Sequence, residues 1–500
     1  MSSVLCTGGV FLADLALRFP IIHPPSFFRL HNSVRAGDPS PTARTTVNLI
    51  YAIGARVKGR GLWRALTTLD HALLETSLET VVVMLLLAIY ALKLPRGPGA
   101  WILCGKALSL AVSISLHQEK APSALAALGL AQKAPSPLEV EMRRRIFWSL
   151  YSLEVATAAM LGRPPSVPSI ISTPLPTEVD IAVENEALLS RLQSGAIFPS
   201  ASTTNMSFAI HTFRLRQIEA KILEAVYRGQ GGASEADAMA LVAELTLWWT
   251  QSPRLGRERP ELACWFEMRF HFAVLLLHQQ NLLQAKAGDA VIETCAISAA
   301  ALCSLSEAKS ATSYPASFPL LSLHTTFLAG ITFLLCIRLD PSRPSLDLAA
   351  TTAACEDCAA TLALFLPGWS AAPGYLRIFR TLAAETLAIL PAHPSTSTAA
   401  LGAVPSYISE AARAPTTEAL ANAPVEQGLF KEFLQPHSFD TSFSFLPDPS
   451  AVSASMPSLF DIPDLPFFSS GDIAVGGADT GIGGEGELDL FSWVGGSGAL

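Results

Sequence analysis

The sequence predicts an all-α fold, and three observations support this prediction. Apolar residues recur at three- and four-residue spacing from about residue 46 to residue 390, as they do on one face of a helix. Alternating strand patterns are nearly absent. Half of the 500 residues are hydrophobic and only 15% are charged, so the chain has ample material for a large core.

The expected helices are separated by Pro and Gly, which end helices. The first twenty residues are apolar but contain Asp14 and lack a basic start, so we expect them to form a first helix rather than a secretory signal. The clearest later helices are expected at Thr80–Leu92 (preceded by Ser77), Ala100–Leu116, Leu138–Leu161, Phe208–Tyr227, Glu235–Thr250, Leu262–Leu283, Val291–Ser306, Phe318–Arg338, Leu346–Leu366 and Tyr375–Leu390.

Two apolar segments raise the question of membrane insertion. Val81–Leu92 is shorter than the roughly 20 residues that span a bilayer. Leu320–Ile337 is long enough, but it contains His324, Gly330 and several hydroxyl side chains, some of which would be costly facing lipid. We therefore predict core helices and no membrane partner, with a membrane protein as the less favoured alternative.

Charge and cysteine usage exclude two classes of protein. The formal net charge is −8, so the chain does not coat nucleic acid through overall basic charge. The eight cysteines are scattered, which does not fit a disulfide scaffold and favours a reducing compartment.

The composition changes after about Pro391. From Phe433 to Leu500 there is no Lys or Arg, while eight Phe and Trp493 are interleaved with nine acidic residues among Ser, Pro and Gly. Such a segment does not easily form its own core, so we expect a disordered acidic tail over residues 431–500. Residues 391–430 would be a linker, residues 46–390 the helical domain and residues 1–45 the segment leading into it.

One stretch carries a family pattern. It runs from Ser77-Leu78-Glu79-Thr80 through Arg143-Arg144-Arg145-Ile146-Phe147-Trp148 to Leu161-Gly162-Arg163-Pro164 and Pro174-Leu175-Pro176. In order, spacing and residue types, it resembles the fungal-specific transcription factor domain, or middle homology region, of zinc-cluster (Zn2Cys6) transcription factors. The resemblance is best over residues 77–176 and weaker over the rest of residues 10–390. One departure lies before His117, where related domains usually have Gly and this chain has Ser115.

Physical chemistry gives these motif residues structural roles. Phe147, Leu150 and Tyr151 share a helix face and should pack in the core, with the three arginines beginning on the opposite side. We expect those arginines to be solvated or salt-bridged, with a nuclear-import signal or a phosphate contact as the alternatives. Gly162 should cap the helix in a left-handed conformation. Arg163 is a candidate partner for a buried carboxylate such as Glu154.

The zinc module of the resembled family is not evident in this sequence. It needs six cysteines with two Cys-x2-Cys pairs, and the single such pair here is Cys355 with Cys358, inside an expected helix and next to no basic run. We expect no metal site and no cofactor in this chain, with zinc only if an upstream cluster was lost from the gene model.

Enzyme motifs give no coherent site. The Gly481–Gly486 stretch matches a dinucleotide-binding pattern in its letters, but no strand precedes it and no helix follows. There is no Gly-x-Ser-x-Gly elbow and no His-Glu-x-x-His pair, so we predict that the chain is not an enzyme.

The resemblance implies a nuclear regulator of RNA polymerase II genes, whose DNA contact comes through a module not present here. A homodimer and a small-molecule effector are further partners that it allows. The alternative is a helical sensor, or a dominant-negative partner of a zinc-cluster factor, that does not bind DNA. The tail would bind coactivators through apolar anchors, unless it is only a solubilising segment. The expected anchors are Phe460, Leu465, Phe467, Phe468, Leu490, Phe491 and Trp493.

Overall fold

A computed structural model describes twelve segments of the chain between residues 16 and 390. They are 16–37, 40–55, 69–73, 75–93, 100–119, 135–197, 203–228, 232–253, 260–311, 319–341, 348–367 and 372–390. All the helices expected after residue 80 are present, and no β-strand occurs in these segments, so the all-α prediction is confirmed for them. The expected first helix is described only at Ala16–Arg18, and the tail lies outside the described residues.

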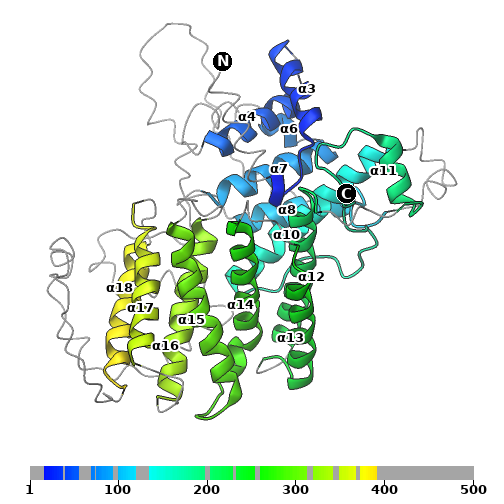
Figure 1. Ribbon diagram of the computed structural model, residues 1–500. Helices are drawn as coiled ribbons and strands as arrows, with labels where there is room; N and C mark the ends of the chain where they lie inside the picture. Colours follow the sequence, from blue (N-terminus) through cyan, green and yellow to red (C-terminus); the bar gives the residue numbers. More distant parts are fainter. Residues whose placement is uncertain are drawn as a thin grey trace, which may run out of the picture.

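The helices fall into two groups joined by one long helix (Figure 1). Helices α3 to α8 form the upper group, α10 lies at its base, and α12 to α18 stand side by side as a row below it. The bounds are α2 Ala16–Arg18, α3 Pro24–Arg35, α4 Pro41–Ala55, α6 Leu69–Leu73, α7 Leu78–Ala91, α8 Ala100–Ser113, α10 Pro137–Leu161, α11 Glu186–Gln193, α12 Ser207–Arg228, α13 Glu235–Thr250, α14 Pro260–Leu282, α15 Ala290–Ala311, α16 Pro319–Leu339, α17 Leu348–Ala363 and α18 Ala372–Leu387.

Helix ends follow the capping residues of the sequence. The Ser77 hydroxyl accepts the Thr80 amide and starts α7, while Ser136 and Glu139 form a reciprocal capping box that starts α10. Gly162 ends α10 with φ 61° and ψ 40°, the left-handed cap predicted for it. These local signals explain why α7 and α10 begin and end close to the expected positions.

One cluster of buried apolar residues runs through both groups, from Phe19 to Leu390. Helix α10 is central to it, because Phe147, Trp148 and Tyr151 are each less than 5% exposed. Their predicted packing role is confirmed. In the lower row, Gly330 lets α16 approach its neighbours, since a Cβ there would lie 2.6 Å from both the Cys358 sulfur and the Phe379 ring.

Helix α16 is the one described helix that is long and apolar enough to cross a membrane, at Leu321–Leu339. However, 83% of that window is buried inside the protein, as in the core helix of a water-soluble fold. The expectation of a core helix therefore fits the packing of this segment better than the membrane alternative.

Helix α8 ends three residues before the expected Leu116, and the reason is a left-handed residue. Ser115 has φ 57°, and the Leu116 amide donates to the Ala111 carbonyl while the Ser115 amide donates to that of Val112. These two bonds form the Schellman arrangement that glycine normally closes. The position where the sequence departs from the resembled family is thus one where glycine is favoured and serine is strained.

Ser115→Gly is expected to raise the free energy of unfolding by about 0.5–1 kcal/mol, because glycine adopts this backbone conformation without a steric penalty. The matched control is Ser113→Gly, the same exchange on the last turn of α8, which should lower stability by a similar amount. Urea denaturation followed by circular dichroism measures both. Equal losses for the two variants would show that Ser115 is not strained.

Candidate functional site

The seven predicted anchors, Phe460, Leu465, Phe467, Phe468, Leu490, Phe491 and Trp493, lie outside the described residues. Their role stays a prediction. The described segments instead contain buried polar clusters, which hold together the stretches that carry the family pattern.

The three arginines of α10 bind different parts of the chain. Arg143 Nη2 donates to the Ile114 carbonyl at 3.0 Å. Arg144 holds Glu119 with two bonds of 2.6 Å, from Nε and from Nη2. A bidentate ion pair of this kind fixes the orientation of the two side chains and also neutralises their charges. Both residues therefore pin the segment that follows α8 against α10.

Arg145 is the most buried of the three, with an exposed fraction of 0%. Its Nε donates to Glu141 Oε1 at 2.8 Å, and its Nη1 donates to the Ile181 carbonyl at 2.9 Å. The prediction of salt-bridged arginines is confirmed for Arg144 and Arg145. They are not solvated on the side opposite the core, because both are buried: Glu119 pairs with Arg144, and loop 173–183 covers Arg145.

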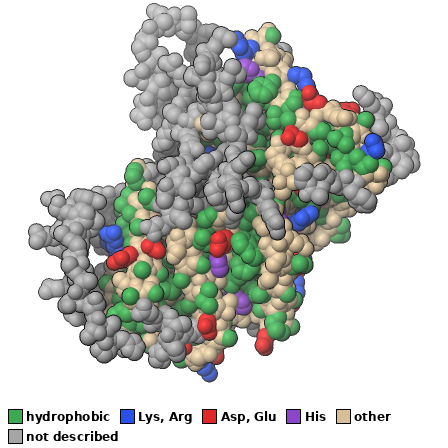
Figure 2. Space-filling view, in the orientation of Figure 1, with side chains coloured by type: hydrophobic (Ala, Val, Ile, Leu, Met, Phe, Trp, Pro, Cys, Tyr) green, Lys and Arg blue, Asp and Glu red, His purple; other side chains and the backbone are tan. Residues whose placement is uncertain are grey.

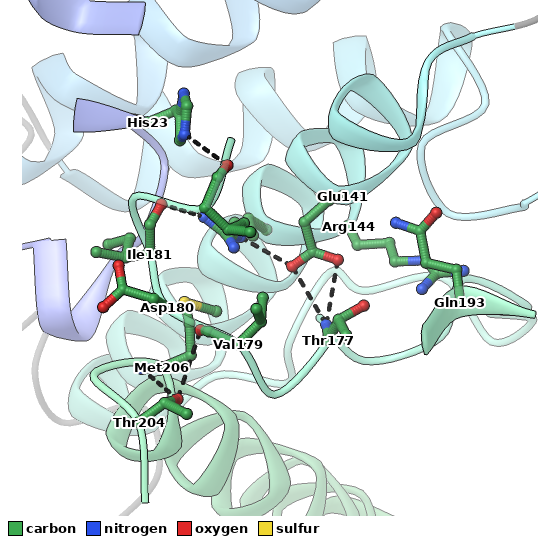
Figure 3. A network of polar contacts seen from close by, with 12 residues as sticks. His23, Glu141, Arg144, Thr177, Val179, Asp180, Ile181, Gln193, Thr204 and Met206 are labelled. Carbon is green, nitrogen blue, oxygen red and sulfur yellow. Dashed lines mark hydrogen bonds and ion pairs between the residues drawn. The ribbon is translucent and has the colours of Figure 1, made fainter. Parts of the chain in front are cut away.

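Loop 173–183 is fixed to α10 along its length (Figure 3). The Glu141 carboxylate faces Thr177 and accepts its amide at 3.2 Å, and the Trp148 indole donates to the Pro174 carbonyl at 2.8 Å. At the far end, His23 Nε2 bonds with the Val183 carbonyl at 3.0 Å. We call Glu141, Arg145 and loop 173–183 the polar clamp.

The polar clamp continues into the start of α12. The Ile181 amide donates to Asn205 Oδ1 at 2.7 Å, and Glu178 accepts hydroxyl bonds from Thr204 at 2.5 Å and Ser207 at 2.6 Å. Segments as far apart as residues 23, 145 and 205 are therefore joined through one loop.

A second buried cluster was missed from the sequence. Glu219 of α12 is 0% exposed and bonds to Arg216 of the same helix and to Arg269 of α14. Burial alone would raise the pKa of Glu219, but the two guanidinium groups outweigh it and the pKa is lowered. Burial also lowers the pKa of Arg269 to about 10. The available signal was a pair of charges at i and i+3 within the apolar face of α12.

Arg163 and Glu154, suggested as partners, have other contacts. The Arg163 guanidinium lies 4.5 Å from the centre of the Trp101 ring, a cation–π arrangement. Glu154 is fully buried and accepts the Ser166 amide at 3.1 Å. Its pKa is raised by burial. Together the two contacts hold the loop after Gly162 against α8 and α10.

Cys355 and Cys358 lie buried on α17, close to Cys303 of α15. Burial raises the pKa of the Cys355 thiol to about 12, which opposes the thiolate form that zinc needs. Among the described residues, no group of three or more His, Cys, Asp or Glu is arranged to hold a metal ion.

His211 of α12 is a buried base without a hydrogen bond to either ring nitrogen. Its ring stacks on Trp248 at 4.6 Å and meets Phe266 edge-on at 4.8 Å. Burial, and secondarily Arg214, lowers the pKa of His211 to about 3. The residue is therefore neutral in the folded protein.

This environment predicts a loss of stability in mild acid. Below pH 6.5 the unfolded chain binds a proton on His211 that the folded chain does not bind until about pH 3. Unfolding is thus favoured as the pH falls through that window, by about 2 kcal/mol at pH 5 for this residue.

His211→Leu should reduce the slope of stability against pH between about 6.5 and 5, measured as urea midpoints at each pH. Part of the dependence of stability on pH will remain in this variant, because burial also lowers the pKa of His324 to about 3. If His211→Leu keeps the full wild-type slope, His211 does not cause the loss of stability in mild acid.

Comparison with known proteins gives one family. Residues 9–249 match the family described as "Fungal specific transcription factor domain". The polar clamp, the Arg163–Trp101 contact and the Glu219 of the second cluster all lie within the matched residues. No solved structure matches the chain with significance.

Curated relatives are fungal regulators that share part of their length with this chain. "Pyrimidine pathway regulatory protein 1" of Saccharomyces cerevisiae is 26% identical over 215 residues, which are 40% of this chain and 22% of the relative. "Transcriptional activator protein acu-15" of Neurospora crassa is 24% identical over 260 residues, covering 49% and 26%. "Positive regulator of purine utilization" of Emericella nidulans is 23% identical over 343 residues, covering 54% and 32%. The chain thus spans about a fifth to a third of the length of these relatives.

Proposed function

From the fungal-specific transcription factor domain that this chain carries over residues 9–249, we propose that it is a nuclear regulator of RNA polymerase II genes in a fungus and not an enzyme. The match to that domain, with relatives named as regulators and activators of transcription, is the observation that carries the proposal. The buried clusters support a structural role for the motif residues, because their charged groups bind other segments of the same chain.

The helical domain, residues 46–390 with residues 1–45 leading into it, would be the regulatory part. The linker 391–430 would connect it to an acidic tail, residues 431–500, that binds transcriptional coactivators. The seven anchors Phe460, Leu465, Phe467, Phe468, Leu490, Phe491 and Trp493 would enter apolar grooves, while the acidic residues steer the tail to basic rims.

DNA contact in this proposal comes from a zinc module outside these 500 residues. On the face drawn in Figure 2, Lys and Arg side chains are scattered singly rather than gathered over one helix. This distribution does not favour a DNA-binding surface there.

Translation of the genomic sequence upstream of Met1 distinguishes a DNA-binding activator from a protein that does not bind DNA. Six cysteines with a basic helix support a DNA-binding activator. Their absence favours a sensor, or a dominant-negative partner, that does not bind DNA.

The tail is tested by fusing residues 430–500 to a neutral DNA-binding module and measuring a reporter gene. Replacing the seven anchors by Ala is expected to lower the activity about tenfold or more, because a few aromatic anchors carry most of the binding energy at such contacts. The matched control replaces Phe433, Phe439, Phe443 and Phe445, which are not among the anchors. No activity from the fusion, or equal loss in both variants, would refute the assigned anchors.

A further inference from the structure

Three thiols meet between helices α15 and α17. Cys303 lies on α15, and Cys355 and Cys358 lie one turn apart on the buried face of α17. Cys303 and Cys358 are 0% exposed, and Cys355 is 5% exposed. The side chains of Cys303 and Cys358 are hydrogen-bonded to each other. Their sulfur atoms are therefore neighbours, although the whole of α16 lies between them in the sequence. We call Cys303 and Cys358 the thiol pair.

The thiol pair is held in place by the three helices around it. Beside it, the Ser304 hydroxyl of α15 donates to Asp357 Oδ2 of α17 at 3.4 Å. The Cys358 thiol also donates to the Thr326 carbonyl of α16 at 3.6 Å. Gly330 of α16 leaves room for this sulfur atom, since a Cβ there would lie 2.6 Å from it. The two cysteines thus lie on helix turns that are fixed against each other, which a disulfide bond between them requires.

A second buried cysteine of α15 differs from the thiol pair. Cys295, two turns before Cys303, is also 0% exposed. Burial raises the pKa of Cys295 to about 12, with no contribution from another thiol of the described residues. The pKa of Cys358 is raised first by its hydrogen bond to Cys303 and then by burial. Helix α15 therefore carries a paired thiol and an isolated thiol that are equally buried.

Burial protects the thiol pair while the helices stay packed. The thiolate is the form that reacts with peroxides, and the raised pKa of Cys358 keeps this residue in the thiol form. Oxidation therefore requires α17 to move away from α15 for a short time. Helices α17 and α18 form one end of the lower row (Figure 1), so they can open without unfolding α12 to α14. In the open state the thiols meet water and small oxidants, and they meet each other again when α17 packs back.

We propose that hydroperoxides convert the thiol pair to a disulfide bond, which joins α15 to α17 around α16. One thiol loses its proton and attacks the O–O bond of the peroxide, so that a sulfenic acid forms and, from hydrogen peroxide, one water leaves. The thiolate of the other cysteine then attacks the sulfenic sulfur, and a second water leaves as the S–S bond forms. In sum, two thiols and one hydrogen peroxide give one disulfide and two waters, and two electrons pass from sulfur to oxygen.

The disulfide bond encloses α16 in a covalent loop that starts on α15 and ends on α17. Such a loop removes conformations from the unfolded chain and stabilises the folded one. It also prevents α17 from leaving α15, so the end of the row that opened to the oxidant is locked afterwards. This response to peroxide goes beyond the proposed regulation of transcription and does not depend on it.

Peptide mapping of the purified full chain tests the proposal. The reduced protein is treated with hydrogen peroxide, the remaining thiols are alkylated, and disulfide-linked peptides are identified by mass spectrometry. The main product is expected to join Cys303 to Cys358. Cys303→Ala should lower the yield of disulfide-linked peptides about tenfold or more, because the sulfenic acid then has no paired thiol to react with. The matched control Cys295→Ala, at the isolated thiol of the same helix, should leave the yield unchanged.

Thermal unfolding gives a second measurement. The peroxide-treated protein should unfold about 5 °C higher before treatment with dithiothreitol than after it, because the disulfide constrains the unfolded chain. Methionine sulfoxide is not reduced by this treatment, so it does not affect the comparison. Cys303→Ala should show no such difference, and Cys295→Ala should show it in full.

Three results would each overturn the proposal. The first is a folded protein that contains no disulfide after peroxide treatment. The second is a main product that joins other cysteines, or that joins two differently labelled copies of the chain. The third is an equal thermal midpoint before and after dithiothreitol. None of these measurements involves gene expression, so this failure is distinct from failure of the proposed function.

Discussion

Arg145→Met is expected to lower the free energy of unfolding by about 3–5 kcal/mol, because it leaves the Glu141 carboxylate buried without its guanidinium partner. Glu141 and Arg145 are both 0% exposed, so water cannot replace the missing partner without opening the polar clamp. The variant also removes the bond from Arg145 to the Ile181 carbonyl. Urea denaturation of the purified chain, followed by circular dichroism, gives the change in midpoint.

Two further variants test whether the effect of Arg145→Met comes from the buried ion pair with Glu141. Arg29→Met breaks an exposed ion pair with Glu184 and should cost at most about 1 kcal/mol. The double variant Glu141→Gln with Arg145→Met removes both buried charges, so it should be more stable than Arg145→Met alone. If Arg145→Met shifts the midpoint no more than Arg29→Met does, the buried pair does not stabilise the fold as described.

Glu219→Gln is the second substitution with a large expected effect, again about 3–5 kcal/mol. It leaves Arg216 and Arg269, whose side chains are 7% and 14% exposed, facing each other without a neutralising carboxylate. The repulsion acts across the contact between α12 and α14, so these two helices should separate first. Hydrogen exchange in α12 and α14 should therefore rise more than in α17 and α18.

The control for Glu219→Gln is Glu224→Gln, five residues further along α12. Glu224 pairs with Arg228 at the surface, where both side chains are about two-thirds exposed (66% and 68%). Its loss should change the free energy of unfolding by less than about 1 kcal/mol. Similar effects of the two substitutions would mean that the Arg216–Glu219–Arg269 cluster contributes no more than a surface pair.

Local signals in the sequence predicted the helices well. Ser77 and Gly162 act through residues three or four positions away, so their role as caps can be read from short segments. The buried face of Phe147, Leu150 and Tyr151 follows from helical periodicity alone. The all-α fold and most helix bounds could therefore be predicted from the sequence.

The buried environment of Arg144 and Arg145 could not be predicted from the sequence. A run of three charges usually marks a solvated surface. Here the partners of Arg144 and Arg145 are Glu119 and the Ile181 carbonyl, 25 and 36 residues away. No periodicity relates these positions, because the contacts form only when the segment after α8 and loop 173–183 pack against α10. Arg269, 50 residues from Glu219, was missed for the same reason.

The polar clamp also sets an order for folding during synthesis. Arg145 finds its carbonyl partner at Ile181, and Ile181 in turn is held by Asn205. Until Asn205 has left the ribosome, the loop that covers Arg145 and Glu141 of α10 is not held in place. Such long-range closure is slow and exposes apolar surface meanwhile. Nascent chains that end before residue 205 should therefore depend on chaperones, whereas chains that extend past it can close the upper group of helices.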